Sequence, residues 1–317
     1  MKNVVISGKE DNILTEIEIS NIIMGSSDFL RLDNMEFAEK ILDKYIALGG
    51  NTFDTARHYR HSEKAIGHWM ESRKNREEVV LLTKGCHPTR ENPSTPRVNA
   101  EAIEEDLLTS LELLKTDHVE LYALHRDDPT KPVGSIMEAL HKQVELGRIQ
   151  AIGLSNWELD RIIEADNYAK KNGLTRVSFT SPNLSLAKPL KPRWENCVSA
   201  NDEMVHWHQK TQMPLISWSS QAGGFFSGNF SPDIKTDKEM VDVYYSDENW
   251  ERYRRAEKLA DKKGVSTIQI SLVYVLSQSF PTSAIIGSEN TEELVSSITG
   301  SKINLTKEEI DWLDLQI

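Results

Sequence analysis

Short apolar segments alternate with longer segments of helical period along almost the whole chain, and this alternation restricts the fold more than any other feature. Strands are predicted at 22–24, 51–54, 79–83, 119–124, 149–154, 177–180, 215–218 and 284–286. Between them apolar residues recur every three or four positions, as at Ile103, Leu107, Leu111 and Leu114, which indicates a buried helix face. Such alternation predicts a parallel sheet. Eight units favour the α/β class and a (β/α)₈ TIM barrel, with an open, doubly wound sheet as the alternative.

Several segments lie outside the repeat. A β-hairpin is predicted at residues 4–19, ahead of the first unit. Three long loops, 85–99, 181–200 and 223–249, follow predicted strands and are expected at the C-terminal face of the barrel, where long loops are usually functional. Because no stretch has the composition of a linker, we expect a single barrel domain over residues 1–317.

Charge and cysteine content exclude several classes of protein. A formal net charge of −12 argues against nucleic acid and acidic membrane surfaces as partners. Two cysteines, Cys86 and Cys197, are too few for a disulfide framework and favour a reducing, cytoplasmic setting. The sequence shows no apolar run long enough for a membrane helix and no signal peptide at its beginning. The oligomeric state stays open.

Polar residues stand at the predicted strand ends, where barrel enzymes carry their chemistry. Asp54, Lys84 and His125 end three successive strands, and Tyr59 follows Asp54 closely. A tyrosine phenol has a pKa of about 10, and a nearby ammonium lowers it. We therefore expect Lys84, held by Asp54, to make Tyr59 a proton donor, and His125 to orient a substrate oxygen.

Four segments in order resemble the aldo-keto reductase family: residues 50–59 with the Asp and Tyr, 82–84 with the Lys, 121–129 with the His, and 153–157. The resemblance implies an eightfold barrel that binds NADP(H), with Asp54, Tyr59, Lys84 and His125 as the catalytic tetrad. It also implies a set of cofactor-binding residues: Gly25, Ser26, Asp54, Ser155, Asn156, Ser181, Trp218, Ser219, Gln221, Gly223, Gly287, Ser288 and Asn290. In this set Ser155 and Asn156 would hold the nicotinamide carboxamide and Trp218 would stack on the ring.

The chain departs from the family pattern in two places. Ser181 stands where Gln is common, and a hydroxyl can still accept from the carboxamide. The loop after the last strand contains Glu289, Glu292 and Glu293, whereas many members have Lys or Arg there for the 2′-phosphate. These carboxylates would repel a phosphate, so NAD(H) is an alternative to NADP(H).

A narrower resemblance concerns the substrate. Residues 181–187, 196–199 and 224–228 are similar to a bacterial subset of the family linked with sugar oxidoreductases. Trp194, Trp218 and Trp250 near the long loops could stack on sugar faces. The expected substrate is thus a small carbonyl compound, an aldehyde, a ketone or a sugar.

Two other functions are weighed against this hydride-transfer enzyme. One is a cofactor-binding barrel that senses or regulates with little turnover. The other is a metal-dependent hydrolase using Asp54, His58 and His125, although no spacing provides a convincing third metal ligand, so no metal is expected. His206 and His208 are expected on a solvated helix edge, and Cys86 as a small apolar filler.

Overall fold

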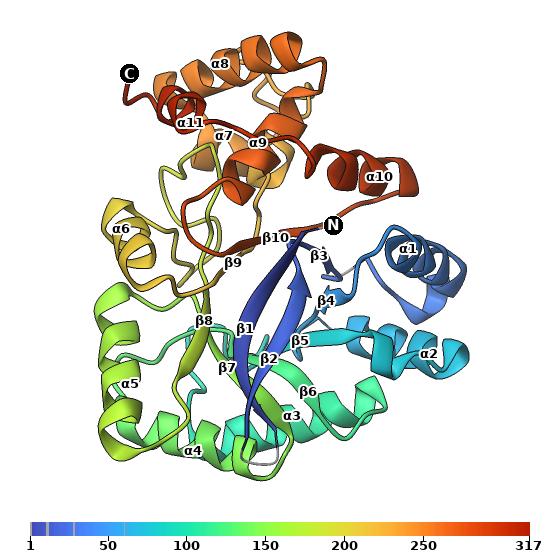
Figure 1. The fold of residues 1–317 in the computed structure, drawn as a ribbon, viewed down its shortest axis with the longest axis vertical. Helices are drawn as coiled ribbons and strands as arrows, with labels where there is room; N and C mark the ends of the chain where they lie inside the picture. Colours follow the sequence, from blue (N-terminus) through green and yellow to red (C-terminus); the bar gives the residue numbers. More distant parts are fainter. Residues whose placement is uncertain (1, 11–12, 28, 60) are drawn as a thin grey trace.

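Eight parallel strands form a closed barrel with helices around it (Figure 1). The computed structural model describes residues 2–10, 13–27, 29–59 and 61–317. Each barrel strand pairs with the next in the chain, and the last, β10, pairs with the first, β3. The barrel strands are β3 (Ile22–Gly25), β4 (Thr52–Asp54), β5 (Val80–Gly85), β6 (Val119–Leu124), β7 (Ile149–Ser155), β8 (Val177–Ser181), β9 (Leu215–Ser217) and β10 (Thr282–Ile286). Closure confirms the TIM barrel and excludes the open sheet.

The connections between strands are helices that cover the outside of the barrel (Figure 1). Helix α3, for example, buries one apolar face with Ile103, Leu107 and Leu114. The helices are α1 (Met35–Ala47), α2 (Ser62–Arg73), α3 (Ala100–Leu114), α4 (Val133–Glu145), α5 (Leu159–Asn172), α6 (Asp202–Thr211), α7 (Lys238–Tyr244), α8 (Asp247–Lys263), α9 (Thr267–Leu276), α10 (Thr291–Gly300) and α11 (Lys307–Leu313), with short 3₁₀ turns at Leu32–Asn34, Arg76–Glu78 and Ala222–Gly224. No helix in the described part of the chain has the length and apolarity required to cross a membrane.

A hairpin of β1 (Asn3–Glu10) and β2 (Ile13–Ser20) lies across the N-terminal end of the barrel (Figure 1). The predicted hairpin is confirmed, although residues 11–12 at its turn lie outside the described residues. Gly8 lies against the carbonyl of Gln150, at the beginning of β7. Ile6 and Ile19 are fully buried and join the apolar side chains that fill the barrel, so the hairpin completes that end of the core.

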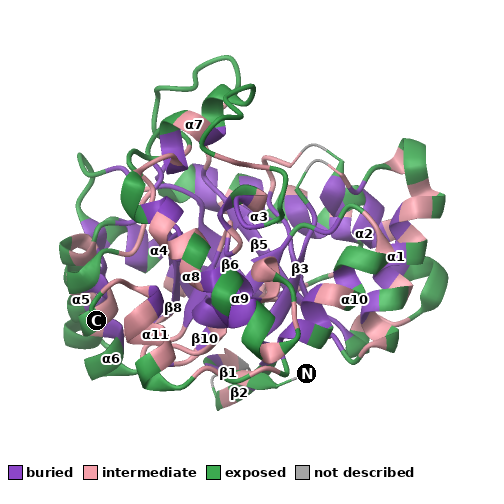
Figure 2. Ribbon diagram, turned by 90° about the horizontal axis from the view of Figure 1, so that it is seen from above, coloured by how far each residue is buried: buried purple, intermediate pink, exposed green. Residues whose placement is uncertain are grey.

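The barrel interior is tightly packed. Residues from the inner face of the strands form one cluster with the hairpin. Gly153 in β7 is part of this packing, because a Cβ there would lie 2.2 Å from the ring of Phe179 in β8. Buried residues occupy the middle of the molecule and exposed residues its rim (Figure 2).

The long segments after β5, β8 and β9 gather at the opposite end from the hairpin, with α7 projecting beyond the barrel (Figure 2). The third predicted loop, 223–249, is not continuous loop, since it contains α7 and the beginning of α8. Asp237 caps α7 by accepting from the Met240 amide at 3.0 Å, and Met240, Val243 and Tyr244 are buried beneath it. This short amphipathic helix was too brief to detect from periodicity.

Candidate active site

The parallel register brings the predicted strand ends to one end of the barrel. Each strand continues its hydrogen bonding into the residues that follow its neighbour: the amide of Arg57 donates to the Lys84 carbonyl at 2.9 Å, and that of His125 to the Gly85 carbonyl at 2.9 Å. Asp54, Lys84 and His125 are all buried. The side chains that were predicted to act together therefore come from adjacent strands.

Asp54 and Lys84 form a buried ion pair at this end. Lys84 Nζ donates to the Asp54 carboxylate and, at 3.1 Å, to the carbonyl of Thr55. Burial raises the pKa of the Asp54 carboxyl, and the adjoining ammonium opposes that shift. A lysine that exposes only 2% of its surface is tolerated because its ammonium donates hydrogen bonds to a carboxylate and to a carbonyl.

Tyr59 and His125 lie next to this pair. Lys84 Nζ is 5.4 Å from the centroid of the Tyr59 ring. The rings of Tyr59 and His125 meet edge to face, with centroids 5.6 Å apart. Burial, followed by the charges of Lys84 and Arg126, holds the pKa of His125 well below its usual value, so its imidazole is neutral. Tyr59 is partly exposed, whereas the other three are buried.

Two further histidines adjoin His125: His58, which was considered only as a ligand in the metal-dependent alternative, and His87, which was not predicted. The rings of His58 and His87 stack with centroids 3.7 Å apart, and His87 lies 4.9 Å from His125. Nδ1 of His87 is 2.8 Å from the Pro88 carbonyl and so must carry the proton, which leaves Nε2 as an acceptor. Burial lowers the pKa of His87 to about 4. His87 follows the end of β5 by two residues, a signal that strand-end reasoning could have used.

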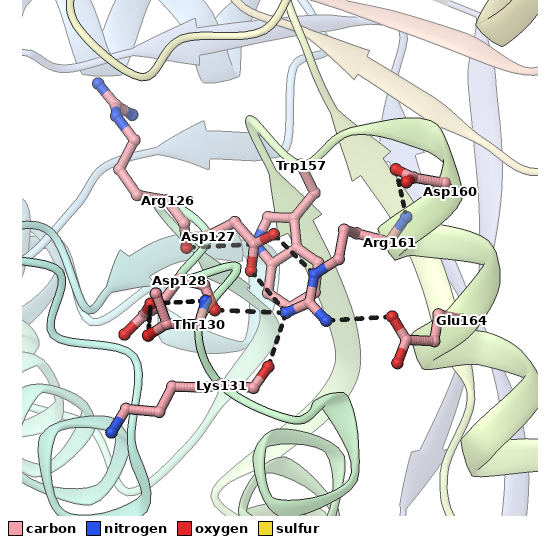
Figure 3. Close-up of polar contacts among 9 residues, drawn as sticks. All are labelled: Arg126, Asp127, Asp128, Thr130, Lys131, Trp157, Asp160, Arg161 and Glu164. Atoms are coloured by element: carbon pink, nitrogen blue, oxygen red, sulfur yellow. Dashed lines mark hydrogen bonds and ion pairs between the residues drawn. The ribbon is translucent and has the colours of Figure 1, made fainter.

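The end of β6 is fastened to the next unit by a polar network (Figure 3). Trp157 Nε1 donates to the Arg126 carbonyl at 3.2 Å. Arg161 at the beginning of α5 binds the Asp127 carboxylate through two nitrogens, at 3.0 and 3.1 Å. These contacts fix the chain around His125 from the side away from the barrel axis.

The side chains of Ser155 and Asn156 form hydrogen bonds with neighbouring segments. Ser155 Oγ donates to the Ser181 carbonyl at 2.9 Å. Asn156 Nδ2 donates to the His125 carbonyl at 3.2 Å and to Ser155 Oγ at 3.1 Å, and its Oδ1 accepts from the Val198 amide at 3.1 Å. The left-handed backbone of Asn156, at φ 59°, aims this amide. Oδ1 retains one lone pair that a ligand amide could use.

Several buried polar atoms, His125 Nδ1 among them, have no hydrogen-bond partner among the described residues. Three others at this end are Ser26 Oγ, Ser181 Oγ and Trp218 Nε1. Unpaired buried polar atoms are unfavourable in a folded protein and call for an explanation. All three belong to the predicted cofactor-binding set. Their donors and acceptors fit the polar groups of a nicotinamide nucleotide.

The turn after β9 carries the residues expected to follow the pyrophosphate. Ser219 and Gly223 have positive φ, at 46° and 61°. Arg193, from the long segment after β8, donates to Ser219 Oγ at 3.1 Å and to Glu239 of α7 at 2.6 Å. A Cβ at Gly223 would lie 2.7 Å from the Arg193 guanidinium. Gln221 is partly exposed beside this turn. Arg193 was not predicted, because it lies in a loop without periodicity.

The predicted adenosine end surrounds the beginning of α10. Asn290 caps this helix by accepting from the Glu293 amide at 2.8 Å, and its Nδ2 donates back to the Glu293 carboxylate at 2.9 Å. The same carboxylate accepts from the Glu289 amide at 2.9 Å. Ser288 is buried and Gly287 exposed. Gly25 has a packing role of its own, since a Cβ there would lie 2.8 Å from the Ile286 carbonyl.

Two expectations were wrong. His208 is not on a solvated edge: it is fully buried, with Nδ1 2.7 Å from the Met213 carbonyl and Nε2 3.1 Å from Thr180 Oγ1. Trp250 does not face the barrel mouth but packs against Phe225, with ring centroids 4.7 Å apart, and is 8% exposed. Trp194 remains 48% exposed and lies 5.6 Å from Trp218. Cys86 is buried as expected. Within the described ranges, no group of three or more His, Cys, Asp or Glu residues is arranged to hold a metal ion.

Comparison with known proteins agrees with this arrangement. A model of the Aldo/keto reductase family matches residues 21–315, and the chain therefore belongs to this family of oxidoreductases. Norsolorinic acid reductase of Emericella nidulans is 29% identical over 288 residues, covering 87% of this chain and 70% of that protein.

Two further relatives cover more of their own length. An uncharacterized oxidoreductase of Bacillus subtilis is 27% identical, over 95% of this chain and 93% of that protein. A putative aryl-alcohol dehydrogenase of Saccharomyces cerevisiae is 26% identical, over 94% and 83%. Among solved structures, a thermostable aldo-keto reductase crystallised with the inhibitor epalrestat has a TM-score of 0.73 at 21% identity, covering 94% of this chain and 96% of that one. This likeness concerns the fold.

Proposed function

We propose that the protein is an NAD(P)(H)-dependent oxidoreductase, working as a single barrel domain, that interconverts a carbonyl and an alcohol by hydride transfer. Tyr59 is its general acid and base. The observation that carries this proposal is the buried Lys84–Asp54 ion pair, which lies beside Tyr59 and His125 at the carboxyl end of the barrel. A buried lysine that only stabilised the fold would need no phenol beside it.

Each of the four residues has a part in moving one proton. The Lys84 ammonium favours the phenolate of Tyr59 and so makes its hydroxyl a better acid. Asp54 holds that ammonium in place. His125 is neutral because burial lowers its pKa, so it can donate a hydrogen bond to the substrate oxygen without competing with Tyr59 for the proton. In the oxidising direction Tyr59 takes the proton from the alcohol.

The nicotinamide cofactor would supply or accept the hydride. We propose that Asn156 and Ser181 hold its carboxamide, that Trp218 lies on its ring, and that Ser155 supports Asn156. Ser26 and the turn with Ser219, Gln221 and Gly223 complete the site, together with Gly25, Asp54, Gly287, Ser288 and Asn290. The unpaired buried atoms of Ser26, Ser181 and Trp218 support this assignment.

The beginning of α10 bears on the choice between NADP(H) and NAD(H). A helix N-terminus normally attracts phosphate. Here the Glu293 carboxylate already accepts from the Glu289 amide, and Glu289 and Glu292 add charge close by. These groups would repel a 2′-phosphate. NADP(H) is the family's usual cofactor, and this local charge supports NAD(H) as the alternative.

Substrate identity is less restricted. The relatives include a norsolorinic acid reductase and a putative aryl-alcohol dehydrogenase. A small carbonyl compound, whether an aldehyde, a ketone or a sugar, is therefore proposed, and Trp194 beside Trp218 offers an exposed aromatic face to it.

Substitution Tyr59→Phe tests the proposal, because it removes the proton and leaves the ring. We expect turnover with aldehydes to fall roughly a hundredfold or more, whereas fluorescence titration with NADH and NADPH should give dissociation constants close to those of the unmodified protein. Turnover within tenfold of the unmodified protein would refute Tyr59 as the acid. Tight cofactor binding without turnover of any aldehyde, ketone or sugar by the unmodified protein would favour a regulatory barrel instead.

A further inference from the structure

Arg126 is a buried cation with no charge partner among the described residues. It is the first residue after His125 at the end of β6, and it exposes only 8% of its surface. Its side chain donates from Nη1 to the carbonyl of His125, at 2.8 Å. Among the residues that the structure describes, no carboxylate forms an ion pair with it. A guanidinium carries five donors, so most of this group's capacity is unused within the fold.

The acidic residues next to it in sequence face elsewhere. Asp127 is bound by Arg161, and the Asp128 carboxylate accepts from the Thr130 hydroxyl at 2.6 Å. The guanidinium of Arg126 points away from this network (Figure 3). Arg161 is therefore the ordinary case of a paired arginine, and Arg126 is the exception.

What surrounds Arg126 increases the need for a negative partner. Its charge acts on His87 and His125, whose imidazoles burial already keeps neutral. Neither ring can supply an anion. A buried charge without a partner is strongly unfavourable, so proteins keep one where it serves binding or catalysis.

The position of Arg126 specifies which ligand could be that partner. It adjoins His125, which lies edge to face with Tyr59, so its neighbours are the groups assigned to the substrate carbonyl. Among the residues assigned to the cofactor, Ser181 and Trp218 come from β8 and from the turn after β9. Asn156 shares the His125 carbonyl with Arg126, but it is assigned to the uncharged carboxamide, so no cofactor phosphate is assigned next to Arg126. A guanidinium binds carboxylate and phosphate through paired hydrogen bonds.

We propose that the guanidinium of Arg126 binds an anionic group of the substrate, a carboxylate or a phosphate, and so selects carbonyl compounds that carry one. This inference rests on the proposed function, since it concerns the substrate of the same site. Arg126 is thus a specificity-determining residue: it acts on a part of the substrate that does not react.

Matched pairs of substrates test the proposal: butanal against succinic semialdehyde, benzaldehyde against 4-carboxybenzaldehyde, and glyceraldehyde against glyceraldehyde 3-phosphate. In at least one pair we expect kcat/KM of the unmodified protein to favour the anionic member roughly tenfold or more, mainly through KM, because a charge-assisted hydrogen bond contributes about that much. The first two pairs report a carboxylate and the third a phosphate.

Three variants separate charge from structure. Arg126→Met should abolish the preference while leaving the neutral aldehydes within about threefold, and Arg126→Lys should restore part of it. The Met variant should fold, because the His125 carbonyl keeps its hydrogen bond from Asn156. Lys131→Met removes the same charge from an exposed position nearby and should leave the preference unchanged.

A binding measurement keeps this inference distinct from the proposed function. Calorimetric titration with benzoate and with neutral benzamide requires no turnover, and benzoate should bind more tightly to the unmodified protein but not to Arg126→Met. If the protein reduces neutral aldehydes but shows no preference for any anion, or if Arg126→Met keeps the preference, the inference about Arg126 is wrong and the proposed function stands. If no aldehyde reacts at all, the proposed function fails, and the benzoate titration alone decides the role of Arg126.

Discussion

At the scale of single residues, the charged groups of the site differ in the partners that they have. Lys84 has a carboxylate partner and a carbonyl, whereas Arg126, among the residues described, binds the carbonyl of its neighbour and no carboxylate. His125 is neutral because of burial. The Lys84–Asp54 pair can be tested through stability alone, independently of any assay for activity.

Substitution Lys84→Met leaves the Asp54 carboxylate buried without its cation. We expect the free energy of unfolding to fall by about 3–5 kcal/mol, the usual effect of removing one member of a buried pair. The double variant Asp54→Asn/Lys84→Met removes both charges and should recover at least half of that loss while remaining inactive. Urea denaturation at pH 7.5 measures both. Equal stability of the single and double variants would show that the two charges do not depend on each other.

Sequence reasoning predicted that Asp54, Lys84 and His125 lie together because they stand at strand ends, and parallel strands end together. It did not find His87 or Arg126. Arg126 is distinguished by having no charge partner among the described residues, and His87 by the burial of its imidazole. Both properties depend on packing rather than on residue type. Arg126 directly follows His125 in the sequence. Its position was therefore known from the sequence, but not that it has no charge partner among the described residues.

At the scale of elements, helix α6 is tied to the barrel by one imidazole. His208 Nδ1 donates to the Met213 carbonyl, which fixes the tautomer, and Nε2 accepts from Thr180 of β8. The ring also stacks on Phe280, with centroids 5.2 Å apart. Helical spacing alone placed His206 and His208 on different sides of α6, but it could not tell which side faces the barrel.

This burial makes stability depend on pH. Burial lowers the pKa of His208 to about 4 from 6.5, so below pH 6.5 the unfolded chain binds a proton that the folded chain refuses, and stability falls as the pH drops towards 4. Between pH 7.5 and 5 we expect His208 to account for about 2 kcal/mol of that loss. Urea denaturation of His208→Gln should show a loss smaller by this amount, and His206→Gln, at an exposed position on the same helix, should behave as the unmodified protein.

At the scale of the whole molecule, the hairpin that completes the core and the candidate active site lie at opposite ends of the barrel. The hairpin covers one end with Ile6, Ile17 and Ile19, and Asp54, Lys84 and His125 stand at the carboxyl ends of the strands, at the other end. The eight-unit alternation was enough to predict the barrel, because every strand repeats the same signal, and the hairpin was predicted separately at residues 4–19. Helix α7 gave no such signal, and its place depends on contacts with Arg193 and with the buried aromatic residues around it.

This division predicts that damage to the hairpin leaves catalysis intact. Ile6→Ala should lower the free energy of unfolding by about 3 kcal/mol, because Ile6 is fully buried. Val5→Ala, the neighbour on the outer face with 43% exposure, should change it by less than about 1 kcal/mol. Both folded variants should keep kcat/KM within about twofold at 25 °C. A large loss of activity in Ile6→Ala below its unfolding transition would contradict the separation.

The amide of Asn156 has a consequence for anyone who wishes to exchange the segment between β8 and α6 for a different one. That single group donates to the His125 carbonyl and accepts from the Val198 amide. It therefore links the segment after β8 to the strand that bears His125. A transplanted loop would have to bring its own backbone donor for the amide oxygen, whatever its other residues were. Without one, the exchange would alter the alignment of the strand that bears His125.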